Sequence, residues 1–206
     1  MNMRINTQRD ALAILIEDIT RALVDRPEYA RVHVIEGERT KILEVSVHQK
    51  DIGKLVGRGG RSAGALRQML FAMGGKVGAR YTLEILDPHH LSNTEEMIED
   101  EDNQDDDRKA DDAFHRDPIA ATQALLTRMA RAIVDDEDQV RVHALVGNRA
   151  AMYELHLAQA DVAKILGRNG KTAEALRNLL INLGRKAGRR FILEIIEPAE
   201  ARATTP

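Results

Sequence analysis

The chain contains two copies of one sequence, placed 110 residues apart. Residues 11–88 align with residues 121–198 without a gap, and roughly 30 of about 78 paired positions are identical. The agreement is strongest between DIGKLVGRGGRSAGALRQML, which begins at Asp51, and DVAKILGRNGKTAEALRNLL, which begins at Asp161. Because two copies of one sequence form the same structural unit, any interpretation of one copy has to fit the other.

An acidic segment separates the copies. Residues 95–117 carry 12 acidic and 3 basic side chains, so this segment has a charge of roughly −9 and the remainder roughly +6, although the whole chain has a formal charge of −3. We expect folded domains at residues 1–88 and 118–200, a disordered acidic linker at 89–117 and a tail at 201–206. The folded parts are therefore basic, which favours a polyanionic partner.

The composition excludes several classes of protein. Of the 206 residues, 43% are hydrophobic and 31% are charged, which is ordinary for a folded protein. The absence of cysteine excludes disulfides, cysteine zinc sites and thiol catalysis. The apolar run at residues 11–16 is too short to span a membrane. We expect a cytoplasmic protein with no membrane partner.

Each copy has the hydrophobic pattern of helix, strand, strand, short helix, glycine break, long helix and strand. In the first copy a helix is expected at residues 11–24, strands at 31–35, 41–48 and 81–85, and a short helix at 52–56 that Asp51 is placed to cap. The long helix follows the glycine break, is marked by apolar residues from Leu66 to Met73, and is expected to end near Gly74. The first helix of the second copy is expected at residues 125–134. His33 and His143 match across the copies and are expected on a strand face, whereas His89 and His90 are expected at the solvated start of the linker.

The glycine break carries the chemistry. A lone Gly-x-x-Gly arises by chance about once per 200 positions, but here it recurs in register, each time followed by a long helix. A turn without Cβ atoms admits a backbone ligand, and the first turn of the next helix offers free N–H groups to a phosphate. Residues 54–80 include six Lys or Arg and no acid, and residues 164–190 include eight Lys or Arg and one acid. This pattern favours a nucleic-acid backbone as the ligand.

The two segments KLVGRGGRSAGALR and KILGRNGKTAEALR, with the helix and strand pair before them, resemble type II KH domains, especially the small bacterial KhpA-like RNA-binding proteins. The resemblance covers nearly all of both copies. It implies an α+β fold, α-β-β-α-α-β in each copy, with a three-stranded sheet packed on three helices. It also implies that single-stranded RNA is the partner, gripped at its backbone by the loop and held along an apolar groove for about four nucleotides.

On this resemblance the RNA-binding residues are the two loops and the basic residues beside them: Lys54, Gly57, Arg58, Gly59, Gly60 and Arg61, and Lys164, Gly167, Arg168, Asn169, Gly170 and Lys171. Candidates for the aliphatic wall of the groove are Ile52, Val56, Ile165 and Leu166. With three Phe, three Tyr and no Trp, the chain lacks the aromatic platforms of other RNA-binding folds. We expect no catalytic residue, metal, cofactor or small-molecule substrate.

Several alternatives remain at this point. The resemblance implies an RNA chaperone or post-transcriptional regulator acting on ribosomal or messenger RNA, and the alternatives are a protein-interaction or dimerisation scaffold and an accessory factor of ribosomal RNA maturation. KhpA-like proteins usually carry one KH domain and pair with another KH protein, so the two domains here either pair with each other or act as independent units. The linker is either a spacer or a competitor for the basic loops. A nucleotide P-loop is excluded because its first glycine would fall at Ile165.

Overall fold

The structure is a computed structural model, and it describes residues 10–37, 40–86 and 113–197. The predictions for residues 89–112 and for the tail at 201–206 lie outside the described residues. The first repeat is built of α1 (Ala11–Leu23), β1 (Arg31–Glu36), β2 (Thr40–Ser46), α2 (Ile52–Val56), α3 (Arg61–Lys76) and β3 (Arg80–Ile85). The second is built of α5 (Pro118–Arg131), β4 (Arg141–Val146), β5 (Ala150–His156), α6 (Gln159–Leu166), α7 (Lys171–Lys186) and β6 (Arg190–Ile196), preceded by the short helix α4 (Ala113–Arg116).

The predicted α+β fold is confirmed in both repeats. Each repeat has a three-stranded sheet with its second strand in the centre, antiparallel to the first strand and parallel to the third. The parallel pair requires a crossover, which the short helix, the glycine loop and the long helix supply. Alternation decides the face that is buried, because Leu43 and Val45 lie fully inside whereas Glu44 between them does not.

The first helix begins at the predicted residue in the first repeat and earlier than predicted in the second. Asp10 caps α1 by accepting a hydrogen bond from the Leu12 N–H at 2.9 Å. The first helix of the second repeat starts at Pro118 and not at 125, because Asp117 accepts hydrogen bonds from two N–H groups of the first turn, at 3.0 Å each. Proline at the first helical position supports this early start.

Two further predictions need correction. Asp51 does not cap α2: its buried carboxylate accepts a hydrogen bond from the Arg26 N–H at 2.9 Å and so fixes the loop that follows α1. Residues 113–116, which the charge pattern places in the linker, form α4. Phe114 is the reason, because it is 4% exposed within the core and its ring lies 5.0 Å from Lys186 Nζ of α7.

One edge of the first repeat is held by a polar network. Asp10 accepts a hydrogen bond from the Tyr81 hydroxyl at 2.7 Å and pairs with Lys41 at 2.9 Å, which ties α1 to both β2 and β3. Burial alone would raise the pKa of Asp10, but the hydrogen bonds from Lys41, Tyr81 and Leu12 outweigh it and hold that pKa below its usual value. Burial and the bond to Asp10 raise the pKa of Tyr81 to about 12.

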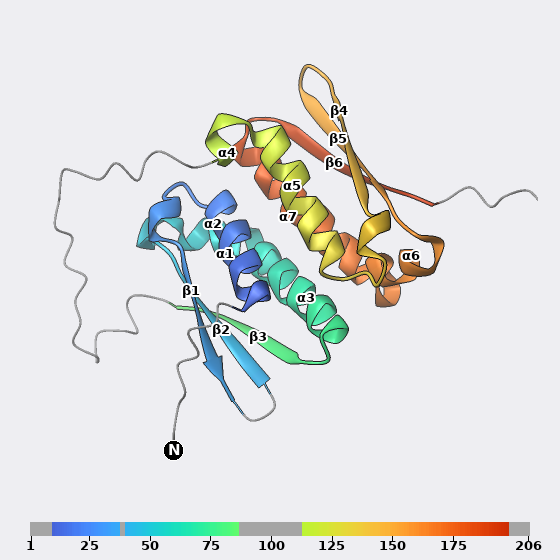
Figure 1. Ribbon diagram of the computed structural model, residues 1–206. Coiled ribbons are helices and arrows are strands. Elements are labelled where there is room, and N and C mark those ends of the chain that lie inside the picture. The colour runs from blue at the N-terminus through green and yellow to red at the C-terminus, as the bar shows by residue number, and fades with distance from the viewer. Residues whose placement is uncertain (1–9, 38–39, 87–112, 198–206) are drawn as a thin grey trace, which may run out of the picture.

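The two repeats pack against each other through their long helices. Figure 1 shows the helices of both repeats between the two sheets, which lie on the outside of the molecule. α3 and α7 form the most extensive helix–helix contact among the described residues. The buried apolar side chains of both repeats join in one continuous cluster. The repeats therefore form one body, and the alternative of two independent domains is excluded for this structure.

Contacts between the repeats obey an approximate twofold symmetry. Lys76 Nζ of α3 donates a hydrogen bond to the Arg131 carbonyl at 2.7 Å, and the matching Lys186 Nζ of α7 donates to the Arg21 carbonyl at 3.4 Å. Asp18 and Arg128 occupy equivalent positions and pair with each other at 2.6 Å. A residue that meets its own equivalent lies on the symmetry axis, so at this point the two repeats are complementary in charge.

Candidate nucleic-acid interface

Each glycine loop is a tight turn between a short helix and a long one. In the first loop Gly57, Gly59 and Gly60 have φ values of 74°, 63° and 74°. In the second loop Gly167, Asn169 and Gly170 have φ values of 70°, 55° and 73°. Asparagine is among the few residues that adopt this left-handed region readily, so the second loop keeps the same backbone path with asparagine in place of glycine at its third position. The two loops are thus alike in backbone shape.

The first glycine of each loop is required by packing. A Cβ atom at Gly57 would lie 2.2 Å from Ser62 Oγ, and one at Gly167 would lie 2.2 Å from Thr172 Oγ1. Ser62 and Thr172 are buried residues in the first turn of the long helices. This close approach presses the loop against the helix that follows it, which fixes the direction in which the loop presents its backbone.

The last glycine of each loop lies next to open space. A Cβ atom at Gly60 or Gly170 would meet nothing within 4 Å, and neither residue makes a side-chain cap for the helix that it precedes. The first N–H groups of a helix without a side-chain cap can bind an anion, and the helix dipole favours negative charge there. Both loops therefore present the chemistry that a phosphate group needs.

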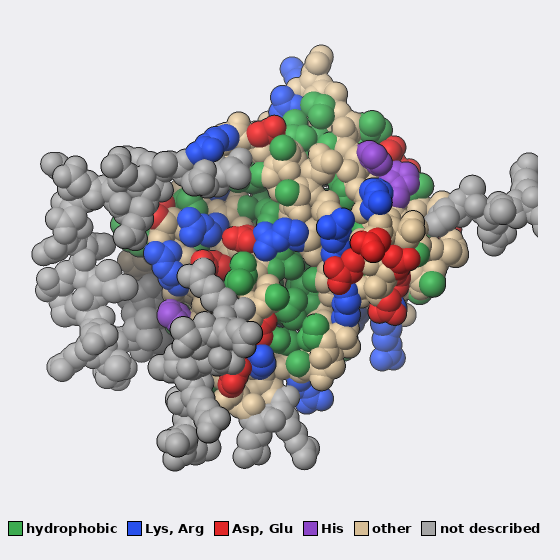
Figure 2. All heavy atoms as spheres, in the orientation of Figure 1, with side chains coloured by type: hydrophobic (Ala, Val, Ile, Leu, Met, Phe, Trp, Pro, Cys, Tyr) green, Lys and Arg blue, Asp and Glu red, His purple; other side chains and the backbone are tan. Residues whose placement is uncertain are grey.

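The basic residues of the loops are exposed beside these N–H groups. Arg58 and Arg61 in the first loop, and Arg168 and Lys171 in the second, all lie at the surface. The Arg61 Nε donates a hydrogen bond to the Arg58 carbonyl at 3.2 Å, which places its guanidinium over the loop. Figure 2 shows Lys and Arg side chains spread over the helical layers between the sheets, beside a cluster of acidic side chains.

The two lysines predicted to extend the phosphate contact are bound to carboxylates. Lys54 pairs with Asp25 and, at 3.5 Å, with Asp51. Lys164 pairs with the equivalent residues, Asp135 and, at 2.9 Å, Asp161. These hydrogen bonds, first that to Asp135, raise the pKa of Lys164. Each lysine would have to share its charge between these acids and a phosphate.

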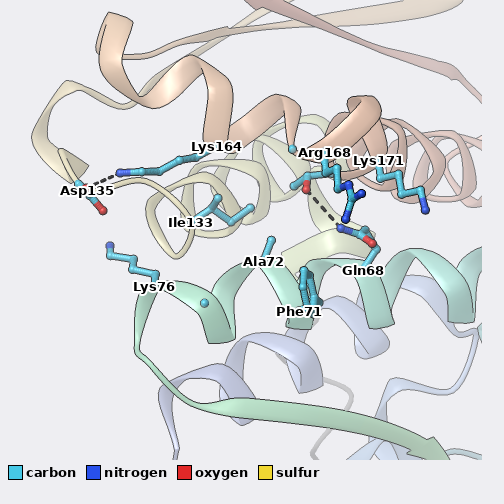
Figure 3. Close-up of a pocket in the computed structure, with 12 residues that line it drawn as sticks. Gln68, Phe71, Ala72, Lys76, Ile133, Asp135, Lys164, Arg168 and Lys171 are labelled. Carbon is cyan, nitrogen blue, oxygen red and sulfur yellow. Dashed lines mark hydrogen bonds and ion pairs between the residues drawn. The ribbon is translucent and has the colours of Figure 1, made fainter.

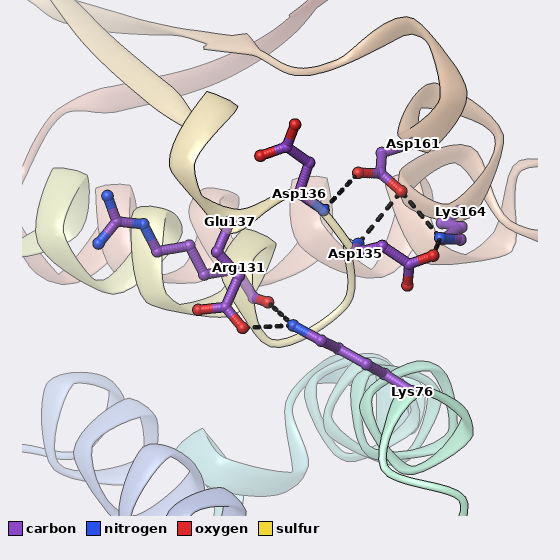
Figure 4. Close-up of polar contacts among 7 residues, drawn as sticks. All are labelled: Lys76, Arg131, Asp135, Asp136, Glu137, Asp161 and Lys164. Atoms are coloured by element: carbon purple, nitrogen blue, oxygen red, sulfur yellow. Dashed lines mark hydrogen bonds and ion pairs between the residues drawn. The ribbon is translucent and has the colours of Figure 1, made fainter.

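Asp161 anchors this arrangement in the second repeat. Its buried carboxylate accepts hydrogen bonds from the N–H groups of Asp135 and Asp136, at 3.2 and 2.9 Å, as well as from Lys164 (Figure 4). Burial would raise the pKa of Asp161, but these hydrogen bonds, with that from Lys164 the strongest, keep it below its usual value. The carboxylate thus fixes the segment that follows α5 to α6, the helix that precedes the glycine loop.

Not every predicted groove residue is available to a ligand. Ile52 and Val56 are half-buried and Leu166 is 36% exposed, so these three can line a groove. The prediction for Ile165 is wrong, because its side chain is fully buried in the core, as is that of Leu55 at the equivalent position. Successive side chains of a helix point about 100° apart, so Ile165 faces the core while its neighbour Leu166 reaches the surface.

Outside the loops, Arg67 has a structural contact, since its Nε donates to the Leu83 carbonyl at 3.2 Å and joins α3 to β3. His33 and His143 lie exposed on the first strand of each sheet, and the His143 ring stacks edge-on against His156 at 5.3 Å.

Within the described part of the chain, no cluster of metal-ligating residues is present. In that same part, no helix is long and apolar enough to cross a bilayer.

The structure adds a feature that sequence reasoning missed, a cleft shared by the two repeats. The second loop, through Gly167, Arg168, Lys171 and Thr172, forms one wall of the cleft, and α3 of the first repeat, with Gln68, Phe71, Ala72, Gly75 and Lys76, forms the other. Its volume is about 680 Å³. Figure 3 shows Gln68 and Phe71 of α3 beneath Arg168 of the loop. The sequence carries one difference that bears on this cleft: the long helix of the first repeat has Phe71 where that of the second has Ile181.

The fold and the loops define a protein with two KH domains, paired through the helices that follow their Gly-x-x-Gly loops. Residues 13–85 and 123–195 both match the family described as KhpA/KhpB, KH domain. The chain belongs to this family, which it represents as a tandem pair.

Individual relatives match one repeat in length. The RNA-binding protein KhpA of Borreliella burgdorferi is 49% identical over 73 residues, which are 35% of this chain and 89% of the relative. The RNA-binding protein KhpA of Aquifex aeolicus is 44% identical over 79 residues, 38% of this chain and 100% of the relative. The RNA-binding protein KhpA of Treponema pallidum is 47% identical over 73 residues, 35% of this chain and 91% of the relative.

Proposed function

We propose that this protein binds single-stranded RNA without catalysis, and that each Gly-x-x-Gly loop holds the sugar-phosphate backbone. The observation that carries the proposal is that both loops present an uncapped helix start, an open glycine and two exposed basic side chains at one place. Membership of the KhpA/KhpB family supports it, as do relatives that are themselves named RNA-binding proteins.

The groove beside each loop holds the bases. Ile52 and Val56 in the first repeat, and Leu166 in the second, provide aliphatic contacts of the kind that tolerate many sequences. Weak base preference together with a firm hold on the backbone suits an RNA chaperone or a post-transcriptional regulator acting on ribosomal or messenger RNA. That role is the finer part of the proposal, together with a cytoplasmic location.

The pairing of the repeats bears on the scaffold alternative. The faces of α3 and α7 that a second KH-domain protein would use for an equivalent contact are occupied by each other. We therefore propose that the pairing partner of each KH domain is its neighbour in the same chain. Two sites held at a fixed separation raise the affinity for one RNA strand by effective concentration.

Fluorescence anisotropy with a labelled random-sequence RNA tests the proposal. The variants replace both central residues of a loop with aspartate: Arg58→Asp with Gly59→Asp, Arg168→Asp with Asn169→Asp, and all four together. We expect a salt-sensitive affinity that falls in each two-site variant and is lost when all four residues are changed. If the four-site variant is folded and binds RNA as well as the unmodified protein does, the loops are not the binding site.

A further inference from the structure

The cleft between the second loop and α3 brings an aromatic ring of one repeat to the binding loop of the other. Phe71 is 74% exposed and is the most exposed large apolar side chain among the described residues. It lies on the cleft wall, one turn after Gln68, whose Nε2 lies 3.4 Å from Thr172 Oγ1 at the end of the second loop. This contact fixes α3, and with it the ring of Phe71, next to the loop (Figure 3).

The cleft has the chemistry of a nucleotide site. Arg168 and Lys171 are exposed at one side of it, while Ala72 and Ile133 provide apolar surface deeper in. A positive rim with an exposed aromatic ring matches the way in which proteins hold unpaired nucleotides, with the phosphate at the rim and the base stacked on the ring.

We infer that Phe71 of the first repeat stacks on a base of the RNA strand whose backbone is held by the second loop. This inference rests on the proposed function. The site is therefore composite: the loop of one KH domain supplies the phosphate contact, and α3 of the other supplies the base contact. Such a site exists only because the repeats are docked through α3 and α7.

The equivalent place at the first loop is built differently. Ile181, Asn182 and Arg185 of α7 stand where α3 has Phe71, Ala72 and Gly75. The Asn182 Nδ2 donates a hydrogen bond to Ser62 Oγ at 2.9 Å, so a polar contact occupies the position where the composite cleft has Ala72. The first loop thus lacks an aromatic platform, and the two loops hold RNA in two different ways.

The test asks which loop Phe71 acts through. Phe71→Ala is made in two backgrounds, one in which the first loop is inactive (Arg58→Asp with Gly59→Asp) and one in which the second is inactive (Arg168→Asp with Asn169→Asp). RNA affinity is measured by anisotropy, and circular dichroism verifies the fold. With only the second loop active, we expect Phe71→Ala to weaken binding about 5- to 100-fold. With only the first loop active, we expect no change.

Two further variants separate a stacking ring from a general apolar contact. Phe71→Tyr retains a ring and should keep the affinity, whereas Phe71→Ile copies Ile181 and should behave as Phe71→Ala does. The matched change Ile181→Ala should have little effect in either background. Retention of affinity in Phe71→Ile, or an effect of Phe71→Ala that appears only through the first loop, would overturn the composite site.

The proposed function fails in a different way. If the loops do not bind RNA, the four-site loop variant binds as the unmodified protein does, and the composite site falls with it. If RNA binding depends on the loops but Phe71→Ala has no effect in any background, the function stands and only the composite site is overturned.

Discussion

At the scale of single residues, different positions of the Gly-x-x-Gly loop serve different functions, some in packing and some in ligand binding. Gly57 serves packing, because a side chain there would meet the buried Ser62, whereas Gly60 lies beside open space where a ligand can approach. The third position tolerates asparagine, as Asn169 shows with a φ of 55°. A motif whose positions look equivalent in the sequence thus combines a folding requirement with a binding requirement.

This division predicts different results for two substitutions in the first loop. Gly57→Ala should lower the free energy of unfolding of the protein by about 2–4 kcal/mol, since it combines a left-handed backbone with a steric clash. The control Gly59→Asn, which copies the second loop, should change it by less than about 0.5 kcal/mol. Urea unfolding followed by circular dichroism measures both. Equal stability of the two variants would show that the packing against Ser62 is not a constraint.

Asp161 supports a second prediction at this scale. Its carboxylate is 3% exposed and accepts hydrogen bonds from two backbone N–H groups and from Lys164, so Asp161→Ala should lower the free energy of unfolding by about 2–4 kcal/mol. Because the pKa of Asp161 is lower in the folded than in the unfolded state, its contribution is complete at neutral pH.

The same contribution should disappear on acidification. As the pH falls below about 4, through the lowered pKa of the folded state, the carboxylate takes up a proton and the stabilisation is lost. The stability difference between the unmodified protein and Asp161→Ala should therefore shrink at low pH. A difference that stays constant from neutral pH to pH 3 would contradict the assignment.

At the scale of elements, the two repeats join α1 and α5 to their sheets by different means. Tyr81 and Lys41 bind Asp10 in the first repeat, and the equivalent residues in the second are Phe191, Ala151 and Ala120. A polar network in one repeat is replaced by apolar packing in the other, in which Phe191 lies edge-on to Tyr153 at 5.3 Å. Both repeats have the same order of helices and strands, so either the polar network or the apolar packing is sufficient to hold the first helix to the sheet.

Reciprocal substitutions test this difference. Tyr81→Phe removes a hydrogen bond to a carboxylate and should lower the free energy of unfolding by about 1–3 kcal/mol. Phe191→Tyr should also destabilise the protein, because it places a hydroxyl in an apolar position that is 3% exposed. Thermal unfolding of both variants is the measurement, and a stabilising effect of Phe191→Tyr would show that a partner for the hydroxyl exists there.

The type and order of the helices and strands could be predicted from the sequence, but some contacts at their ends could not. Hydrophobic period and the repeated glycine break predicted the type and order of every element in both repeats, because these depend on local pattern and on one buried face. The errors fell where a contact between distant segments decides the outcome. The local sequence predicts that Asp51 caps a helix, but its carboxylate binds the Arg26 N–H. Phe114 extends folded structure into a segment whose charge predicts disorder.

At the scale of the whole molecule, the decisive feature is the docking of α3 on α7, which the sequence left undecided. The repeat itself allowed both paired and independent domains, since the face of α3 that carries Ser62, Gln68 and Lys76 shows no strongly apolar stripe. The partners of these three residues are polar groups of the other repeat: Asn182, Thr172 and Glu137. The composite cleft with Phe71 follows from this docking, so it too was invisible in the sequence.

The ion pair between Asp18 and Arg128 on the symmetry axis is expected to stabilise the docking of the two repeats. Asp18→Arg sets two arginines against each other and should lower the free energy of unfolding by roughly 0.5–1 kcal/mol, a small effect because both side chains are partly exposed. The exchange of both charges, Asp18→Arg with Arg128→Asp, should restore it. If the double variant is no more stable than the sum of the single changes, the pair does not contribute to docking.

The central claim is that RNA contacts the backbone of both loops. Nuclear magnetic resonance tests it most directly, through the amide signals of the ¹⁵N-labelled full chain during titration with a short single-stranded RNA. We predict that the largest shifts fall on the amides of Arg61 and Ser62 and of Lys171 and Thr172, which form the first turns of two long helices that have no side-chain cap. Tight binding that leaves these four amides unmoved would contradict the account and place the RNA on another surface.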